Sequence, residues 1–560
     1  MIKIINLERL NQVKLILNEI KLTKFKIFAS ISIFYFFTLM GAFLEGLALI
    51  LLASVFTGGI NDSSNALDIS SSIVKYLDFP ILELSIKEIV LIIITIYFFA
   101  FIIRFSEWSF YGWILATLRR KLQEIVFKKY INAPWFLMKD FPVGTASNTN
   151  IQETQLSVRY IFKLLLCGNY LVQSFAFMIL ATFIDYKTFI LLSFVSIPII
   201  FLLRLVIKYQ TILSKKMADL RNLFSSNIVD RLNGLFQIQL EKDFDNHFNK
   251  GIEAQQKWTR FEVIIGLCQA LIATLIVVVP LVCLSIFYFL YDEKNSIDTF
   301  SIATVILLGI KLFNQLNSFI VNYTDLSRLS GSLYPVCEVL KIEQRKLKQK
   351  ALEEINSIMI SKISFKFKNK FIFKNINLEI NKGRPLVIQG KSGVGKTTLV
   401  NIISGIYSPS QGSIIYKGNK NLYNNQVFDI IVGYVAQDIY LFNGSIRENL
   451  DISNNKSDKD IWKCLKLIDA EKFVKNMGGL DAYIAENGKS LSGGQKRRIG
   501  IARALLLDSE LLIFDEITNG LDYENVEKLN KVVKRLSLNH LMIYISHTKV
   551  NFENQKILKL

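Results

Sequence analysis

The stretch from Gly390 to Thr398 constrains the fold of this 560-residue chain more than any other. It follows a short apolar run, 386–389, and precedes an apolar-periodic segment that begins at Leu399, so the order is strand, glycine loop, helix. The loop has the pattern G-x-x-x-x-G-K-T. Its glycines let successive backbone N–H groups turn inward around phosphate oxygens, and the helix N-terminus adds the positive end of its dipole. The sequence therefore predicts an α/β domain with a phosphate-binding loop.

The residue types in this loop assign separate roles. We expect Lys396 to reach the outer phosphates of a nucleotide and the Thr397 hydroxyl to ligate Mg²⁺. A glycine-rich turn that matches the pattern by chance is the alternative, and the flanking strand and helix argue against it. The loop residues predicted to contact the nucleotide are Gly390, Lys391, Ser392, Gly393, Val394, Gly395, Lys396, Thr397 and Thr398.

The composition indicates that a membrane-embedded region accompanies this domain. Hydrophobic residues make up 51% of the chain, with 42 Phe and only 8 Pro, a balance typical of a membrane half joined to a soluble half. The formal net charge of +19 indicates either nucleic-acid binding or Lys and Arg that flank membrane spans, and the apolar content favours the second. The scattered 5 Cys and 3 His predict neither a disulfide framework nor a Cys or His metal site.

Six segments are long and apolar enough to cross a bilayer, which takes about 20 residues. We therefore predict a membrane α-helical domain with six transmembrane helices, followed by an α/β P-loop ATPase domain. A charged segment near residue 345 marks the boundary, which gives domains 1–345 and 346–560. The six segments are 27–56, 89–118, 164–183, 188–207, 263–290 and 302–323.

Positive charge sets the expected orientation of these spans. Lys and Arg gather in residues 1–26 and in the connections 119–163 and 208–262, whereas the connection after the fifth span carries acidic residues. By the positive-inside rule the N-terminus, these two connections and the ATPase domain are cytoplasmic, in a multi-pass protein of the cell (inner) membrane. We expect residues 1–26 to include an amphipathic helix on the cytoplasmic membrane surface. The connection 57–88 would lie outside, as a short surface helix or a loop.

The two long cytoplasmic connections are predicted to be continued helices, each broken near its middle. The breaks fall around 132–144 and 232–234, where Asn, Pro and Gly occur. A loose loop fits poorly with connections of this length and apolar content. Helices that run below the membrane and turn back would form levers able to contact a soluble domain.

Charged residues inside membrane spans are costly and usually face a polar interior. Glu45, Arg104, Glu107 and Lys311 have this position. Asn314 and Gln315 follow Lys311 at spacings of three and four residues, so these three polar residues share one helix face. A structural ion pair is the alternative to substrate contact, and Arg104 and Glu107, three residues apart, could form one. The residues that we predict to contact a transported substrate are Arg104, Lys311, Asn314 and Gln315.

Polar residues end three apolar runs of the α/β domain. The run 511–514 ends in Asp515 and Glu516, 433–436 ends in Gln437, and 541–546 ends in His547. At the carboxyl edge of a parallel sheet, Asp515 can hold Mg²⁺ through water, and Glu516 can polarise a water for attack on the γ-phosphate. His547 is placed to hydrogen-bond the γ-phosphate, with a purely structural histidine as the alternative.

A second glycine loop, Leu491-Ser492-Gly493-Gly494-Gln495, also opens a predicted helix and has N–H groups able to bind an anion. Together with the loop at Gly390–Thr398 and the stretch 439–450, it makes the sequence resemble the ATP-binding cassette transporters. The resemblance covers essentially the whole chain. It implies six spans followed by one cassette, the arrangement of exporter half-transporters.

The resemblance implies roles for individual residues. Phe367 stands where the family usually has an adenine-stacking tyrosine, and Asp522 would link the two ATP sites of a dimer. The segments near 138–150 and 225–234 resemble the family's coupling helices, and 485–488 resembles the segment that contacts them. The signature residues that would complete the ATP site of a partner subunit are Ser492, Gly493, Gly494 and Gln495.

The same resemblance implies an ATP hydrolase with ATP and Mg²⁺ as cofactors. One cassette per chain and a signature that acts in trans imply a dimer, and the intact Glu516 and signature favour a homodimer. The catalytic set would be Glu516, His547, Gln437 and Lys396, and the metal-ligating set would be Thr397, Gln437 and Asp515.

The expected activity is alternating-access export or flipping of an amphipathic substrate. We place a lipid or lipid-linked glycan first, because Arg104 and the polar face of the sixth span could meet an anionic headgroup. Export of a peptide or drug stays open, as does an ATP-gated channel or regulatory membrane protein. A nucleic-acid partner is disfavoured by the six spans.

Overall fold

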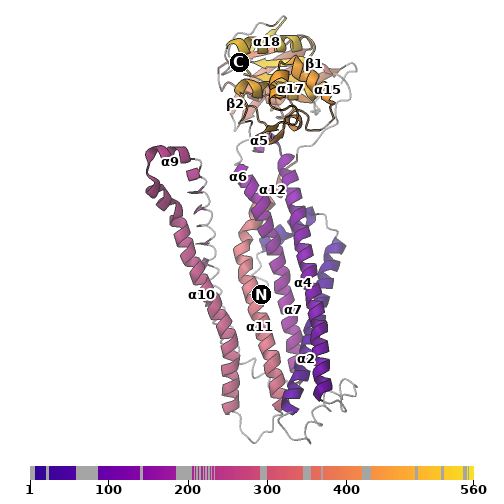
Figure 1. Cartoon of the computed structure of the whole chain (residues 1–560), viewed down its shortest axis with the longest axis vertical. Helices are drawn as coiled ribbons and strands as arrows, with labels where there is room; N and C mark the ends of the chain where they lie inside the picture. Colours follow the sequence, from indigo (N-terminus) through magenta and orange to yellow (C-terminus); the bar gives the residue numbers. More distant parts are fainter. Residues whose placement is uncertain are drawn as a thin grey trace. The chain divides into compact units, whose positions relative to one another are not determined.

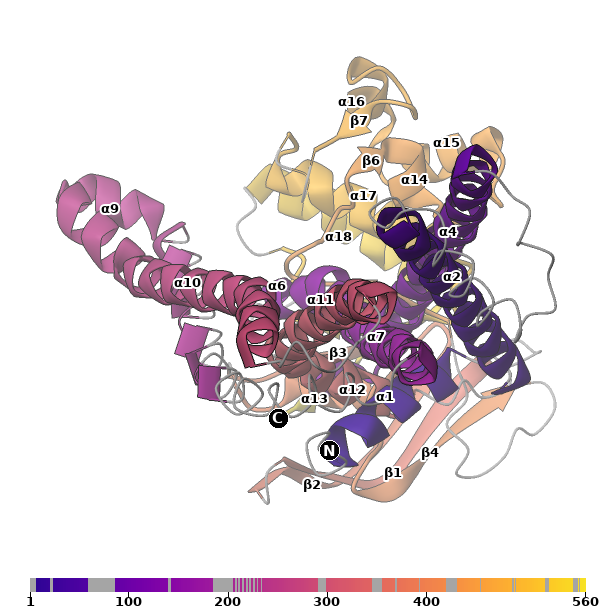
Figure 2. The same cartoon turned by 90° about the horizontal axis from the view of Figure 1, so that it is seen from below.

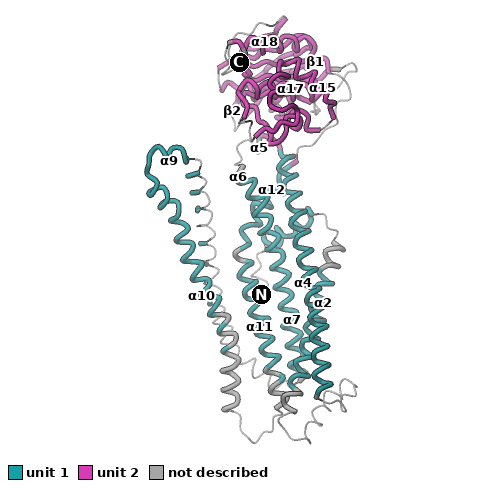
Figure 3. Tube along the Cα trace, viewed as in Figure 1, with its two compact units in different colours: residues 1–133, 141–343 teal, residues 134–140, 344–560 magenta. Residues whose placement is uncertain are grey.

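A computed structural model describes most of the chain. The described residues divide between two compact units, which Figure 3 colours separately. Residues 1–133 and 141–343 form what we call the helical unit, and residues 344–560 with 134–140 form the α/β unit. The described residues are 7–20, 24–58, 86–138, 143–184, scattered positions from 205 to 232, 234–290, 299–344, 355–367, 370–391, 393–418, 431–453, 455–485, 488, 490–518, 523–546, 552 and 554–560.

Long helices dominate the helical unit. Four of them, α2, α4, α7 and α11, lie side by side in both views (Figures 1 and 2), with α7 packed along α11 and α2 packed along α4. Short helices occupy the turns between them. The elements are α1 (Leu7–Glu19), α2 (Lys24–Gly58), α4 (Ile86–Ile131), α5 (Trp135–Met138), α6 (Val143–Asn148), a π-helical turn (Thr149–Glu153), α7 (Thr154–Ile184), α9 (Leu235–Glu241), α10 (Phe244–Leu290), α11 (Thr299–Leu329), a 3₁₀ turn (Ser330–Ser332) and α12 (Leu333–Lys341).

Small residues let these helices approach closely. A Cβ on Gly46 would lie 2.3 Å from Leu180 Cδ1, and one on Gly168 would lie 2.2 Å from the Tyr35 hydroxyl. A Cβ at either position would force the Leu180 or Tyr35 side chain to move, so glycine lets α2 and α7 pack closely with these side chains in place. Between these helices lies a small apolar core of Ala42, Leu49, Phe177, Ala181 and Leu308.

The outer surface of α4 is strongly apolar. Leu91, Ile94 and Phe98 are each more than 60% exposed. Within the part of the chain that the structure describes, three helical stretches are long and apolar enough to cross a membrane: Ile31–Ala53, Lys87–Ile131 and Thr145–Phe183. They overlap the first three predicted spans. The fifth and sixth predicted spans fall within α10 and α11, and almost all of 188–207 lies outside the described residues, so six spans stay a prediction.

The N-terminal helix α1 differs from its predicted setting on a membrane surface. Val13 and Ile16 of this helix, and Ile20 directly after it, are all buried, with Ile16 at 0% exposure. They pack in one cluster with residues of α4, α7 and α12, including Leu122 and Leu333. Because protein already covers its apolar face, that face is not available to lipid.

The two connections predicted to be cytoplasmic contain helices in their described parts. Helix α4 continues to Ile131, beyond the predicted end of its span at 118, and then breaks at Asn132 and Ala133. On the other connection, Lys242 adopts a left-handed conformation (φ 56°) that separates α9 from α10. Figure 1 shows α9 and the adjoining part of α10 diverging from the four packed helices. The predicted outer segment 57–88 lies almost entirely outside the described residues.

The α/β unit is built on two main sheets. The strand order is β2-β1-β4 in an antiparallel sheet and β10-β3-β9-β8-β5 in a parallel sheet, with a short β6-β7 pair beside them. The strands are β1 (Ile355–Phe367), β2 (Lys370–Asn381), β3 (Leu386–Gln389), β4 (Gln411–Gly418), β5 (Val432–Val435), β6 (Gly444–Ser445), β7 (Tyr483–Ile484), β8 (Leu511–Asp515), β9 (Leu541–Ile545) and β10 (Lys556–Lys559).

Helices cover both faces of the parallel sheet, which explains why its central strands are continuous apolar runs. Every residue of β8 and β9 is buried. Side chains alternate along β3, so that Leu386 and Ile388 pack in one core cluster and Val387 packs in another. The helices are α13 (Lys396–Ile403), α14 (Ile446–Leu450), α15 (Asp458–Leu467), α16 (Glu471–Asn476), α17 (Gly493–Leu506) and α18 (Tyr523–Ser537).

Candidate functional site

The glycine loop joins β3 to α13 and needs glycine at several positions. Gly393 and Gly395 have φ angles of 84° and 101°, in the left-handed region that favours glycine. A Cβ on Gly390 would lie 2.8 Å from the carbonyl oxygen of Leu560, and one on Gly395 would lie 2.5 Å from Ile372 Cγ2. The loop therefore turns tightly under close packing, with its exit on the first turn of α13.

Lys396 is the first residue of α13 and is only 7% exposed. Its ammonium group donates a hydrogen bond to the Gly390 carbonyl oxygen (2.8 Å) and lies 3.7 Å from Glu516 Oε1. Since a buried ammonium group is stable only with such partners, Lys396 links the two ends of the glycine loop to the end of β8. This brings together two members of the predicted catalytic set.

Asp515 ends β8, and its side chain meets a tyrosine of the neighbouring strand. The Tyr434 hydroxyl donates a hydrogen bond to Asp515 Oδ2 (2.7 Å), and Asp515 is 8% exposed. Burial, and then the hydrogen bond to Asp515, raise the pKa of the Tyr434 phenol far above its ordinary value. The phenol is therefore protonated and acts as the donor. Tyr434 was not among the residues predicted from the sequence. It lies in the apolar run 433–436 before Gln437, where alternation along a strand places it on a definite face of the sheet.

Glu516 follows β8 in an unusual conformation. Its φ is 49°, which costs a non-glycine residue about 1–2 kcal/mol. The Glu516 N–H donates to the carbonyl oxygen of Ile545 at the end of β9 (3.1 Å), and the side chain is half-buried. This turn ends β8 and holds the carboxylate beside Lys396, where a general base for water could act.

The other predicted positions differ in where they lie. Thr397 is exposed and Thr398 is half-buried in the first turn of α13, and Gln437 is exposed two residues past the end of β5. In the loop itself, Lys391 and Gly393 are exposed and Val394 is half-buried. Phe367 ends β1 and pairs with Lys370 of β2. The predicted residues Ser392, Asp522 and His547 lie outside the described residues.

The donor set at this edge fits Mg²⁺. Thr397 and Asp515 supply hard oxygen ligands, which this ion prefers, and it is commonly completed by phosphate oxygens and water. Within the described ranges, no group of three or more His, Cys, Asp or Glu residues is placed to hold a metal ion. Thr397 and Asp515 would therefore hold the ion together with nucleotide phosphates and water.

The second glycine loop forms a complete capping box at the start of α17. The Ser492 N–H donates to Gln495 Oε1 (2.9 Å), and the Gln495 N–H donates to Ser492 Oγ (3.3 Å). Two of the donors that a helix N-terminus leaves unpaired are thereby satisfied. Gly493 is exposed and Gly494 is half-buried in the first turn, so this helix start is fixed before any anion binds.

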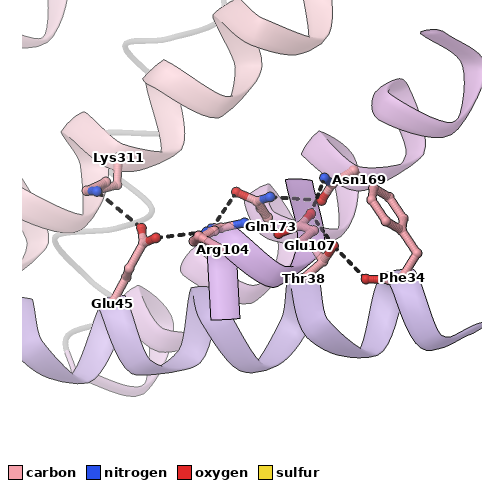
Figure 4. A network of polar contacts seen from close by, with 8 residues as sticks. All are labelled: Phe34, Thr38, Glu45, Arg104, Glu107, Asn169, Gln173 and Lys311. Carbon is pink, nitrogen blue, oxygen red and sulfur yellow. Dashed lines mark hydrogen bonds and ion pairs between the residues drawn. The ribbon is translucent and has the colours of Figure 1, made fainter. Parts of the chain in front are cut away.

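The helical unit contains a second polar cluster, which Figure 4 shows. Arg104 on α4 donates through Nε to Glu45 Oε1 (3.0 Å), through Nη1 to Glu107 Oε2 (3.1 Å) and through Nη2 to Gln173 Oε1 (3.0 Å). Lys311 on α11 donates to Glu45 Oε2 (3.2 Å). We call this cluster the Arg104 network, and it joins α2, α4, α7 and α11.

The buried end of the Arg104 network is Glu107, which is 3% exposed. Its Oε1 accepts hydrogen bonds from the Thr38 hydroxyl (2.9 Å) and from Asn169 Nδ2 (2.7 Å), and Gln173 Nε2 donates to Asn169 Oδ1 (2.8 Å). The Arg104–Glu107 pair that the sequence analysis raised as an alternative is present. Asn169 and Gln173, four residues apart in an apolar segment, were not singled out although their spacing on one helix face was visible.

The four predicted substrate residues therefore differ in setting. The Arg104 guanidinium is engaged through three nitrogens, with 20% of its side chain exposed, whereas 34% of the Lys311 side chain is exposed. On the same helix Asn314 is exposed and Gln315 is half-buried. Lys311, Asn314 and Gln315 are the accessible members of the set.

Comparison with known proteins places the α/β unit in a family. Residues 373–519 match the family described as ABC transporter. An uncharacterized ABC transporter ATP-binding protein of Sinorhizobium fredii is 37% identical over 195 residues, which is 34% of this chain and 33% of that protein. The heterocyst differentiation ATP-binding protein HepA of Nostoc is 29% identical over 349 residues, 58% of this chain and 55% of HepA.

A third relative is named for export. The β-(1→2)-glucan export ATP-binding/permease protein NdvA of Agrobacterium vitis is 34% identical over 189 residues, 33% of this chain and 32% of NdvA. The matches thus span between about a third and about half of the length of these three relatives.

Proposed function

Because this chain belongs to the ATP-binding cassette (ABC) transporter family, we propose that it is a half-transporter that couples ATP hydrolysis to export across a membrane. One observation carries the ATPase part. Glu516 and Lys396, which come from the end of β8 and the start of α13, lie 3.7 Å apart at the carboxyl edge of the parallel sheet. This proximity supports the proposal that Glu516 is the general base and Lys396 the phosphate-binding cation of one site.

The residues at this edge divide the work of binding and hydrolysis. Lys396 and the loop N–H groups would hold the phosphates, and Glu516 would orient the attacking water and accept its proton. Thr397 and Asp515 would hold Mg²⁺, which when bound neutralises phosphate charge. Gln437 and His547 complete the proposed catalytic set, and Phe367 and Asp522 complete the proposed nucleotide contacts.

We propose that a second copy of the chain completes each ATP site. The capping box fixes the start of α17, so Ser492 and Gly494 could present a hydroxyl and an N–H group to the γ-phosphate of a facing subunit. Glu516 and the signature are both intact in this chain, which supports a homodimer with two competent sites. Closure of such a dimer around ATP would drive alternating access.

We propose that the turn after α4 transmits this closure to the membrane helices. The resemblance gives this role to the segment 138–150, which begins at the last residue of α5 (Trp135–Met138). The turn at α9 is the second candidate for transmission.

For the substrate we propose an amphipathic molecule, with a lipid or lipid-linked glycan first. Lys311, Asn314 and Gln315 support this choice, because they offer a cation and two amides at accessible positions of α11. Arg104 would act through the Arg104 network. The export named for NdvA supports transport in general, and its match covers only 33% of this chain.

The experiment that tests the ATPase assignment is Glu516→Gln in the purified full-length protein. Phosphate release should fall to background while ATP binding is kept, because the amide cannot accept the proton of the attacking water. Glu524→Gln, which changes an exposed carboxylate of α18, is the matched control and should leave the rate unchanged. Unaltered phosphate release by the Glu516 variant would refute the assignment.

Transport is tested separately in inverted membrane vesicles. ATP-dependent accumulation of a labelled amphipathic lipid supports export. Accumulation of a labelled peptide or drug instead would move the substrate class to the first alternative. An ionic current without hydrolysis would indicate an ATP-gated channel.

A further inference from the structure

We propose that Tyr434 is a positioning residue for the magnesium–nucleotide site, because its phenol holds the Asp515 carboxylate in one orientation. The proposal rests on the proposed ATPase function and assigns a role to a residue that neither the glycine loop nor the signature contains. It starts from a single contact: the Tyr434 hydroxyl donates to Asp515 Oδ2 at 2.7 Å, between residues 81 positions apart.

The strand register explains how the two side chains meet. In the parallel pair β5–β8, Tyr434 lies opposite Ile513 and Val435 lies opposite Phe514. Side chains alternate along a strand, so Asp515, two residues beyond Ile513, projects on the same face as Tyr434. Two residues span about 6.6 Å along the strand, and neighbouring strands are about 4.8 Å apart. A tyrosine reaches diagonally over that distance, whereas a shorter side chain at 434 would stop before Asp515.

The chemistry of the contact is suited to orientation. Asp515 is 8% exposed and ends its strand, and the Tyr434 hydroxyl is one partner that restrains rotation of its carboxylate about the terminal bond. A hydrogen bond from a neutral donor to a charged acceptor is stronger than one between neutral groups. The phenol therefore restrains one carboxylate oxygen, and with it the orientation in which the carboxylate would meet Mg²⁺.

A purely structural role for Tyr434 makes a different prediction. Strand β5 is the last strand of the parallel sheet among the described residues, so the Tyr434–Asp515 bond could serve only to fasten β5 to β8. In that case its loss would lower thermal stability without changing how the protein responds to magnesium. The two roles are separated by the magnesium dependence of nucleotide binding.

The test is Tyr434→Phe in the full-length protein, which removes one oxygen atom and keeps the ring. The affinity for mant-ATP is measured by fluorescence in Mg²⁺ and again in EDTA. We expect affinity in Mg²⁺ to fall about tenfold, the value of one hydrogen bond to a charged group, while affinity in EDTA stays unchanged. The free Mg²⁺ concentration that gives half-maximal hydrolysis should rise by a similar factor.

Two further variants make the result specific. Tyr483→Phe removes a tyrosine hydroxyl that bonds to Asn443 on the β6–β7 side of the same unit, and it should change neither measurement. In an Asp515→Asn background, Tyr434→Phe should have little further effect on the Mg²⁺ response, because the two residues act as one pair.

The outcomes distinguish this inference from the proposed function. If the wild-type protein shows no magnesium-dependent ATP binding, the proposed function fails. If it does, and Tyr434→Phe lowers only the thermal midpoint, Tyr434 is a structural residue and the inference is overturned. An equal effect of Tyr434→Phe with and without Asp515 would overturn it as well.

Discussion

The helical unit holds a half-buried cation, Arg104, and the α/β unit holds a buried one, Lys396, and the two cations are placed in different ways. Arg104 directs three nitrogens at Glu45, Glu107 and Gln173, which are side chains on α2, α4 and α7 (Figure 4). Lys396 donates to a backbone oxygen of its own loop and lies 3.7 Å from a carboxylate held by a left-handed turn. Arg104 therefore connects several helices through side-chain contacts, whereas the backbone of the glycine loop and of the turn at Glu516 determines the position of Lys396.

Charge balance sharpens this difference. Two carboxylates, Glu45 and Glu107, face two cations, Arg104 and Lys311, so the charged side chains of the Arg104 network sum to zero. In an apolar helix bundle such pairing lowers the cost of burying each ion. The interior of the network therefore serves the packing of four helices. Lys311, with 34% of its side chain exposed, is the most accessible of these four charged residues, and we propose that it is the one that meets a substrate.

The largest effect on stability should follow from Arg104→Met. It leaves the Glu107 carboxylate, 3% exposed, without its cation, and breaking a buried pair from one side costs about 3–5 kcal/mol. We expect a clear drop of the thermal midpoint of the detergent-solubilised protein, with mant-ATP affinity unchanged. A second variant that also carries Glu107→Met should recover part of the loss, because no unpaired ion remains. A midpoint equal to that of the wild type would show that the network contributes nothing to stability.

Lys396→Met should show the opposite pattern. Loss of a preorganised cation at a reacting phosphate typically lowers the rate between about 100- and 1000-fold, and we expect a fall of this size in phosphate release. The thermal midpoint should move less than in the Arg104 variant, because a methionine fills the buried space and the Glu516 side chain, 12% exposed, is better solvated than that of Glu107, 4% exposed. Lys472→Met, on an exposed position of α16, is the control. If the Lys396 variant loses as much stability as the Arg104 variant, then Lys396 also has a structural role, and the proposed difference between the two cations is wrong.

The two regions also differ in how much the sequence predicted. The glycine loop, the acidic end of β8 and the capped start of α17 depend on residues close together in the chain, and their strand, loop and helix patterns are local. Arg104–Glu107 was likewise readable, since residues three apart share a helix face. Because these features depend on local patterns, their residues can be predicted from the sequence alone.

The rest of the Arg104 network could not be predicted in the same way. Arg104 lies 59 residues from Glu45 and 69 from Gln173, and Lys311 lies 266 residues from Glu45. Which of these side chains meet depends on how α2, α4, α7 and α11 pack, and that packing depends on close approach at Gly46 and Gly168. The apolar face of α1 fits lipid or protein equally well by pattern alone, and the packing of α4, α7 and α12 decides between them. Tyr434 and Asp515 likewise meet through strand register.

Lys311→Met should have the smallest effect on stability, and it sharpens the comparison most directly. When Lys311 is lost, Glu45 keeps its bond to Arg104, and a partly exposed ion pair is worth only about 0–1 kcal/mol. We therefore expect a thermal midpoint near that of the wild type and unchanged basal phosphate release, whereas ATP-dependent accumulation of an anionic lipid in inverted vesicles should fall several-fold. Lys311→Arg, which keeps the charge, should retain transport. If Lys311→Met instead destabilises the protein as much as Arg104→Met and transports normally, the accessible edge belongs to the structural network and the substrate contact must be sought elsewhere on α11.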